Sequence, residues 1–454
     1  MKLISNILNV VSSNVIGFGS SFIVGFVLPL YLSVSEFGLY KEYMLYLSFV
    51  YLFNFGYNDG VFIKYGGQDF KTIDKKAIVS EHSFVLIFQL IMFILMLIVS
   101  LVMNHTILLL FSVATLFTTV MTYHRNLLQA VGEFKLYARS NIIQTIINIL
   151  TIVAVILFTS NESYIYFVIM NIITTILSYA YLEYHYYKIF GNHFSFKIRD
   201  NIKLFKVGIF ILIANMSMAF IGNVGSWFVN LFFTIESFAQ YSFSNSLLNT
   251  ILLIVNSVGM VFYSVIARTD NQVTLNYLKR ILLIIGTIGG SIYFVFSIII
   301  TTFMDKYIPS LGILAITFLT VPYIIIIRIV IANLYKSKRS EKLYFKVMVL
   351  LVALSIIIVT LFYFITKTME GIAMGTFVTY LMWYLYSTEK EFVFLHNSKK
   401  DIFLIISHFI VFYISSILLP MQIGFLVYIL YTIVVLYLFK KDILEIFKYV
   451  KSNK

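Results

Sequence analysis

Two charged residues stand inside long apolar stretches of this chain, where charge is costly, and both could act on a ligand. Arg328 lies within Pro322–Asn333, about 12 Å along a helix from Lys336. A guanidinium at that depth should face protein or water, and its planar fork suits phosphate oxygens. The alternatives are a structural pairing with a carbonyl or an acid, and a reach to the inner interface. Pro322 removes a backbone donor and predicts a kink.

Asp59 is the only acid well inside an apolar stretch, in Asn54–Gly60. One interpretation is an interfacial ion pair with Lys64 or Arg125. The other is a site that couples transport to a proton or a cation.

Polar side chains also recur along one face of several apolar stretches. They include Asn9 and Ser13 in 7–32, Asn215 and Asn223 in 205–233, Asn245 and Asn249 in 241–267, and Asn141 and Gln144 in 140–160. Such stripes either line water or bond one helix to another. We favour a wet cavity for 7–32 and 205–233, with 241–267 adding to it, and helix–helix bonding for 140–160.

Other reactive groups are few. The chain has no cysteine, which excludes disulfides and thiolate chemistry. Its seven histidines are scattered, without an HExxH motif, and we expect His408 to be packed rather than active. Glu183 lies at the inner end of a stretch and is assigned a solvated role. No GxxxxGK[ST] loop is present. The sequence therefore predicts no catalytic residue, no metal site and no cofactor.

The elements that must position these residues are apolar. Hydrophobic residues make up 60% of the 454, and the mean hydropathy is +0.94. Stretches long enough to cross a bilayer number fourteen. They are centred on 7–32, 40–63, 82–103, 105–123, 140–160, 163–185, 205–233, 241–267, 281–303, 309–335, 345–366, 372–392, 402–420 and 422–439. We predict an all-α polytopic membrane protein of about fourteen transmembrane helices.

Basic residues fix an orientation for these helices. Of the 33 Lys and Arg residues, 29 lie in the N-terminus, in every second gap and in the C-terminal tail, three lie in the other gaps, and Arg328 lies within a span. Because basic loops stay cytoplasmic, both termini are predicted to be inside. The net charge of +13 is thereby spread over eight inner segments, which favours contact with anionic lipid headgroups and excludes nucleic acid as a partner.

Two weak sequence echoes suggest an internal duplication. Residues 30–40 resemble 231–241 at an offset of 201, and 135–137 resemble 342–344 at an offset of 207. Six helices per copy insert the two copies in the same orientation, with a binding site between them. The predicted domains are an N-lobe (1–192), a C-lobe (193–400), and accessory helices 13–14 with an amphipathic cytoplasmic tail (401–454).

The chain resembles the Wzx-type polysaccharide exporters, which share a superfamily with the lipid II flippase MurJ and the MATE drug exporters. The residues that carry this resemblance are Pro29–Tyr40, the stretch Phe55–Lys64, and Leu128–Glu133. The resemblance implies a flippase in the bacterial cytoplasmic membrane that moves an undecaprenyl-diphosphate-linked oligosaccharide to the outer leaflet. The surface product would be O-antigen, capsule or exopolysaccharide.

The family's cavities are cationic, which adds the inner-end residues Lys64, Arg125 and Arg268 to Arg328 as candidate contacts. The first helix of this chain, however, lacks the Arg and Asp of MurJ-like members and the cation-binding Asp of many MATE exporters. Expected partners are the lipid-linked oligosaccharide, membrane lipids, and a polysaccharide polymerase with chain-length proteins. A cation-coupled multidrug exporter of the MATE type is the second hypothesis. A membrane polymerase or ligase is the third, disfavoured because all outer loops are short.

Overall fold

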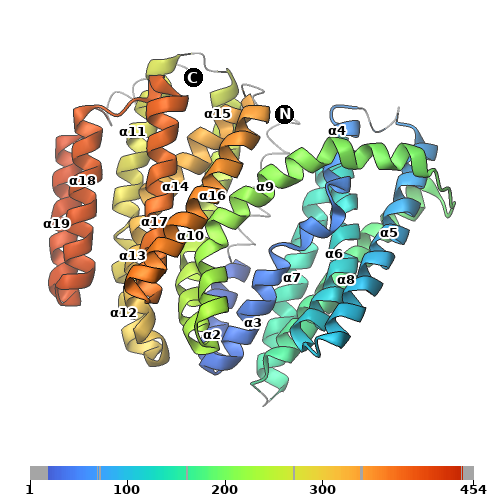
Figure 1. Cartoon of the computed structure of the whole chain (residues 1–454), viewed down its shortest axis with the longest axis horizontal. Coiled ribbons are helices and arrows are strands. Elements are labelled where there is room, and N and C mark those ends of the chain that lie inside the picture. The colour runs from blue at the N-terminus through green and yellow to red at the C-terminus, as the bar shows by residue number, and fades with distance from the viewer. Residues whose placement is uncertain are drawn as a thin grey trace. The chain divides into compact units, whose positions relative to one another are not determined.

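The fold is built from helices throughout the described ranges. The computed structural model describes residues 19–68, 70, 73–159, 162–268, 271–337, 341–440 and 442, and every regular element in these ranges is helical (Figure 1). The chain divides into two compact units, Met1–Asn223 and Val224–Lys454, with the boundary inside one long helix, α9 (Ile198–Phe232). The domain boundaries at 192 and 400 stay predictions.

The N-terminal unit is a bundle of long helices preceded by short, broken ones. Its elements are η1 (Ile23–Val27), α2 (Leu28–Tyr31), α3 (Val34–Leu47), η2 (Val50–Asn54), α4 (Tyr57–Tyr65), α5 (Lys75–Val102), α6 (Thr106–Ala130), α7 (Phe134–Phe158), α8 (Tyr164–Phe190) and the first part of α9. Helix α6 packs against α4, α5 and α8, and α7 packs against α8. Helix α6 is therefore the centre of this unit.

The C-terminal unit has more breaks. After the end of α9 come α10 (Ile235–Arg268), α11 (Gln272–Gly289), α12 (Ile292–Phe303), η3 (Asp305–Ser310), α13 (Leu311–Leu319), α14 (Val321–Ile326), η4 (Ile327–Ile331), α15 (Ala332–Ser337), α16 (Glu341–Thr366), α17 (Met369–Tyr386), η5 (Ser387–Glu391), η6 (Val393–Leu395), α18 (Lys399–Tyr413), η7 (Ile414–Leu418) and α19 (Met421–Leu438).

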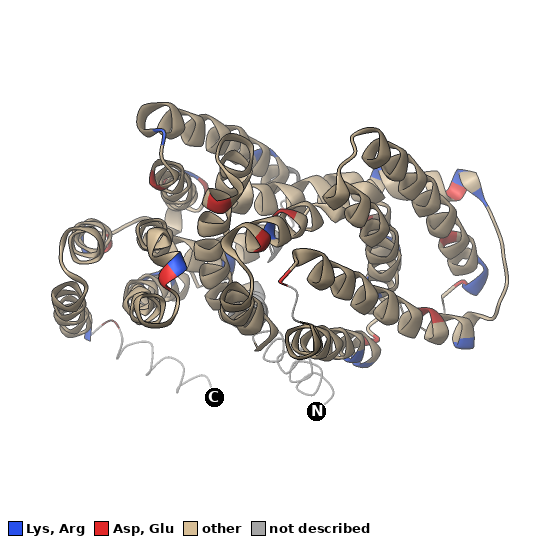
Figure 2. Cartoon of the chain, turned by 90° about the horizontal axis from the view of Figure 1, so that it is seen from below, with Lys and Arg blue, Asp and Glu red and all other residues tan. Residues whose placement is uncertain are grey.

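The protein is a multi-pass membrane protein. In the described residues, nine helical segments are long and apolar enough to cross a bilayer, or ten if one bent pair counts as a span. Helix α5 shows why: Leu90, Ile91, Ile94, Leu95 and Ile98 form a stripe that is about half exposed, as expected of a face covered by lipid. Charged residues occupy little of the helical ribbon (Figure 2). The number of fourteen spans stays a prediction.

The kink predicted at Pro322 is confirmed. The helical segments 305–319 and 321–335 meet at an angle of 44°, and Pro322 is the second residue after the break. Helix α11 approaches this point closely at Gly286, where the absence of a side chain makes room for Pro322. A Cβ atom added to Gly286 would lie 2.4 Å from Pro322 Cα. Five residues further on, the chain widens into the π-helical segment η4, which contains Arg328.

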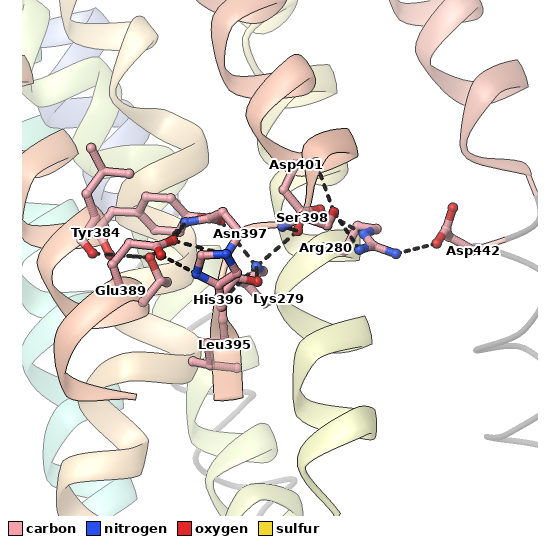
Figure 3. A network of polar contacts seen from close by, with 12 residues as sticks. Lys279, Arg280, Tyr384, Glu389, Leu395, His396, Asn397, Ser398, Asp401 and Asp442 are labelled. Carbon is pink, nitrogen blue, oxygen red and sulfur yellow. Dashed lines mark hydrogen bonds and ion pairs between the residues drawn. The ribbon is translucent and has the colours of Figure 1, made fainter. Parts of the chain in front are cut away.

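A buried ionic network joins α11 to the accessory helices of the same unit (Figure 3). The Lys279 and Asp401 side chains are both 0% exposed and lie 3.1 Å apart. The Lys279 Nζ also donates to the carbonyl oxygens of Leu395 (2.8 Å) and His396 (3.2 Å) and to Asn397 Oδ1 (3.2 Å). The ammonium is thus surrounded by acceptors, which offsets the cost of removing its charge from water.

Arg280 extends the network. Its Nε donates to Asp401 Oδ1 (2.7 Å), its Nη1 to Asp442 Oδ1 (2.6 Å) and its Nη2 to Ser398 Oγ (2.9 Å). We expected basic residues of the inner loops to contact lipid headgroups. For Lys279 that expectation is wrong, because the α11 register turns its side chain into the protein.

We predict that Asp401→Ala destabilises the protein by about 3–5 kcal/mol, because the buried Lys279 ammonium keeps its carbonyl partners but loses its counter-charge. Unfolding of the purified protein in detergent measures the effect. Lys400→Ala is the control, because the Lys400 side chain is 63% exposed and its ion pair with Asp442 is long, at 3.5 Å. It should change stability by less than about 1 kcal/mol. Equal effects of the two substitutions would contradict a buried ionic anchor.

Candidate functional site

A polar cavity of about 350 Å³ lies inside the N-terminal unit. Elements η2, α4, α6, α7 and α9 line it. The lining includes three residues singled out from sequence, Asp59, Arg125 and Asn215, and further polar side chains at Asn54, Thr122, Asn126, Gln129 and Asn141. So many amides and hydroxyls in an apolar bundle indicate a space that holds water or a polar ligand.

Arg125 supplies positive charge to this cavity. It is half-buried on α6, and its Nη2 donates to Gln144 Oε1 (2.8 Å) and to the Ser140 carbonyl oxygen (3.3 Å), both on α7. Its Nε lies 3.4 Å from Ser140 Oγ. All three contacts are neutral, and in the described part of the chain Arg125 forms no ion pair. Its charge is therefore oriented by α7 and stays available to an anion.

Asp59 lies on α4 at the same cavity and is partly buried. It forms neither of the two ion pairs that the sequence offered. Lys64 binds the buried Glu81 instead, and Arg125 is held by α7. Within the described ranges, no cation neutralises the Asp59 carboxylate. The coupling role proposed for Asp59 stays a prediction.

The cavity forms where a predicted span is broken. The stretch 40–63 was expected as one helix, but it is interrupted between α3 and α4. Phe55 and Gly56 adopt left-handed backbone conformations (φ 50° and 84°), and Asn54 Oδ1 accepts the Gly56 N–H at 2.8 Å. Asn58 then anchors α4 by donating to the Thr119 carbonyl oxygen of α6 (2.9 Å). Non-helical backbone at membrane depth is tolerated where it is buried or lines a polar space.

Glycines bring α9 against α4 at the cavity. A Cβ atom added to Gly208 would lie 1.8 Å from the Gly56 carbonyl oxygen, and one added to Gly60 would lie 2.2 Å from the Leu204 carbonyl oxygen. Gly56 and Gly60 have the GxxxG spacing that lets two helix backbones touch. This contact places Asn215 of α9 and Asp59 of α4 on the same cavity.

Arg328 lies in the other unit, in the π-helical segment η4. Its Nη1 donates to Asn256 Oδ1 of α10 at 2.9 Å, and it also interacts with Tyr380. These partners are neutral, so the pairing with an acid that we considered is not found among the described residues. Single-turn π-helical segments often occur at functional sites.

The remaining candidates fall in several places. The Asn223 amide donates to Ala219 of its own helix (2.9 Å), and the Asn245 amide donates to Ser226 Oγ (3.0 Å), joining α10 to α9. Asn249 is exposed. Asn9, Ser13 and the Arg268 side chain lie outside the described residues. The stripe of 140–160 has both roles, because Asn141 lines the cavity whereas Asn148 and Thr151 bond neighbouring segments.

Two histidines and one acid form a buried cluster that the sequence does not predict. The histidines are scattered in sequence, but His82 and His124 converge on Glu183 in the structure. Glu183 is only 8% exposed, so the solvated role assigned to it is wrong. Linear spacing carries no signal for this cluster, because its members come from α5, α6 and α8. His408 is buried against Tyr428, as predicted.

Comparisons with known proteins agree on a family and a fold. The sequence model of a family described as "Polysaccharide biosynthesis protein" matches residues 3–270. No curated protein matches the chain. Among solved structures, the lipid II flippase MurJ in an inward closed conformation has a TM-score of 0.67 at 17% identity, covering 97% of this chain and 100% of that one.

Two further solved structures share the fold. A mutant of the Vibrio cholerae MATE transporter VcmN gives a TM-score of 0.58 at 12% identity, covering 87% of this chain and 99% of that one. A MOP superfamily transporter from Pyrococcus furiosus gives 0.51 at 11% identity, with 86% and 96% covered. At these identities the likeness establishes the fold alone.

We predict that Gly208→Ala destabilises the N-terminal unit by about 1–3 kcal/mol, because the added methyl group must push α9 away from the α4 backbone. Gly19→Ala is the matched control, since nothing lies within 4 Å of a Cβ atom at Gly19. Thermal unfolding of both variants in detergent provides the measurement. If Gly208→Ala and the wild-type protein melt at the same temperature, the α9 backbone does not lie as close to α4 as the structure shows.

Proposed function

Since the chain belongs to the polysaccharide biosynthesis protein family, we propose that it is a flippase for undecaprenyl-diphosphate-linked oligosaccharide repeat units. The substrate would pass from the cytoplasmic to the outer leaflet of the bacterial cytoplasmic membrane and enter surface polysaccharide synthesis, as O-antigen, capsule or exopolysaccharide. The observation that supports this best is the polar cavity in the N-terminal unit, with the guanidinium of Arg125 held there by neutral partners alone.

The physical task explains why such a cavity is needed. A diphosphate carries negative charge, and moving charge from water into hydrocarbon costs many kcal/mol. An arginine oriented toward a polar cavity replaces part of the lost hydration with charge-assisted hydrogen bonds. The cavity volume of about 350 Å³ lies in the range of small-ligand sites. The polyprenyl tail would stay in lipid throughout, so only the headgroup needs a polar path.

Orientation and movement complete the proposal. The alternation of basic loops predicts that both termini lie in the cytoplasm. Lobes of parallel orientation that rock against each other would expose the headgroup site to each side in turn. The proposed lobes are 1–192 and 193–400, with accessory helices 401–454. No residue is assigned a catalytic role, and partners would include the polysaccharide polymerase and chain-length proteins.

Arg328 is proposed as a second contact for the diphosphate. Like Arg125, it is held by neutral side chains, so its charge is not cancelled by an acid within the described residues. The kink at Pro322 and the π-helical segment around Arg328 give this stretch two places where its backbone can bend. The other candidates from the sequence remain proposed as further cavity contacts: Asn215, Asn223, Asn245, Asn249, Lys64, Arg268, Asn9 and Ser13.

The second hypothesis is a cation-coupled multidrug exporter. It is supported by the fold shared with MATE transporters and by Asp59, a carboxylate at the cavity without an ion-pair partner among the described residues. Deleting the gene separates the two. Accumulated lipid-linked oligosaccharide and lost surface glycan support the flippase, whereas altered drug susceptibility with normal surface glycan supports the exporter.

We predict that Arg125→Ala lowers surface polysaccharide at least about tenfold and raises the cytoplasmic pool of lipid-linked intermediate, because one charge-assisted contact to phosphate is lost. Arg125→Lys should recover part of the activity, since it restores charge but not the bidentate geometry. Cells at matched expression are compared by glycan staining and lipid extraction. Arg139→Ala is the control, because Arg139 is exposed and directly precedes Ser140, one of the α7 residues that Arg125 contacts. Equal transport by Arg125→Ala and the control would refute the role of Arg125.

We predict that substituting Arg328 lowers surface polysaccharide less than Arg125→Ala does. The level should be lower in Arg328→Ala than in Arg328→Lys, and lower in both than in the wild type. The reason is that the Arg328 charge would contact the substrate during only part of the transport cycle. The same glycan and lipid measurements apply, with Asn256→Ala included to show what loss of the positioning contact alone does. Wild-type glycan levels in both arginine variants would end this proposal.

A further inference from the structure

Three residues far apart in sequence meet in the N-terminal unit at a point separate from the proposed substrate cavity. His82 comes from α5, His124 from α6 and Glu183 from α8, and they are 3%, 3% and 8% exposed. The His124 Nε2 lies 2.7 Å from Glu183 Oε2. The His82 Nε2 lies 3.0 Å from Oε1 and 3.2 Å from Oε2 of the same carboxylate.

The geometry of the three groups is convergent. The Nε2 atom of each imidazole faces the carboxylate, and the three potential ligand atoms all lie within 4.8 Å of one another. Tyr186 stacks on the His82 ring with centroids 4.0 Å apart and an interplanar angle of 28°, which fixes the orientation of that ring. The imidazole rings are therefore held in place by packing, as a preorganised site requires.

Hydrogen bonding within the cluster leaves one atom unsatisfied. Both imidazoles reach Oε2 with acceptable hydrogen-bond geometry. The buried Oε1 lies 3.0 Å from His82 Nε2 but accepts no hydrogen bond among the described residues. Tyr179 and Tyr187 also interact with the carboxylate. A buried carboxylate oxygen without a hydrogen bond is rare and calls for an explanation. A cation between the three groups would bind Oε1 and both Nε2 lone pairs together.

We propose that His82, His124 and Glu183 form a binding site for a divalent transition metal, with Zn²⁺ the best fit. Two imidazoles and one carboxylate are a common zinc donor set, and imidazole favours zinc, copper, iron and nickel over magnesium or calcium. Tetrahedral ligands about 2.1 Å from the ion are about 3.4 Å apart, so the His124 Nε2 and Glu183 Oε2 atoms, now 2.7 Å apart, would need to separate by about 0.7 Å. Water would fill the fourth position.

The site would control the geometry of the proposed substrate cavity. His124 is followed directly by Arg125, which lines that cavity from a different face of α6. An ion shared by α5, α6 and α8 would fix the rotation of α6 about its axis, and with it the direction of the guanidinium. The metal would thus be a structural cofactor of the N-terminal unit. This inference does not depend on which substrate the cavity carries.

The test is zinc binding by the full-length protein, purified with an affinity tag that contains no histidine and stripped with a chelator. Isothermal titration with Zn²⁺ and metal analysis after gel filtration are expected to give about one ion per chain. His82→Gln, His124→Gln and Glu183→Gln should each weaken binding by more than about 100-fold, because even outer-shell changes cost 10- to 100-fold. His185→Gln is the control, since this half-buried histidine of α8 forms its hydrogen bond within its own helix, to the Tyr181 carbonyl oxygen.

Each result decides the proposal. Zinc should raise the melting temperature of the wild type and of His185→Gln but not of the three site variants. Binding that is unchanged in those variants identifies an adventitious ion and overturns the site, as does a wild-type protein that takes up no zinc at micromolar concentrations. If the variants fail to fold, X-ray absorption of the zinc-loaded wild type still decides, because the site requires two imidazole ligands and one carboxylate ligand.

Discussion

The cost of removing charge from water is the constraint on which the rest of this structure depends. Lys279 shows how the constraint is met, because its fully buried ammonium is surrounded by Asp401, an amide and two carbonyl oxygens. Glu183 meets it with two histidines. Arg125 and Arg328 meet it only with neutral groups. An anionic substrate requires a charged side chain that is held in place but not neutralised by an opposite charge. The presence or absence of a charged partner therefore separates the structural charged residues from the proposed functional ones.

Breaks in the helices have the same physical origin. A bilayer favours uninterrupted helices because each unpaired backbone group is costly there. The helix interruptions nonetheless lie beside the charged residues proposed to be functional. One is at Asn54–Gly56, next to the cavity, and the other is at Pro322, before Arg328. In the first case the Asn54 side chain replaces a lost backbone bond, and glycines allow α9 to close against α4. Local backbone irregularity and the polar cavity are therefore one feature of the N-terminal unit.

Much of the architecture could be predicted from composition and order alone. Apolar stretches long enough to span a bilayer predict an all-helical membrane protein, and this is confirmed because every regular element in the described residues is a helix. Pro322 predicts the bend, because proline lacks the donor that a straight helix needs. Asp59 and Asn215 could be proposed as candidates because polar residues are conspicuous in apolar surroundings, and Arg125 because the resembled family has cationic cavities. All three line one cavity.

The sequence by itself determined which stretches enter the membrane and which residues are expensive to place there, since both follow from the transfer cost of each side chain. Only the tertiary structure decided which of those residues find partners. Lys64 pairs with Glu81 and not with Asp59, Lys279 turns inward to Asp401, and His82, His124 and Glu183 meet across three helices. The reason is that helix rotation and packing set these contacts, and residues 17 to 122 positions apart leave no periodic trace of them in the chain.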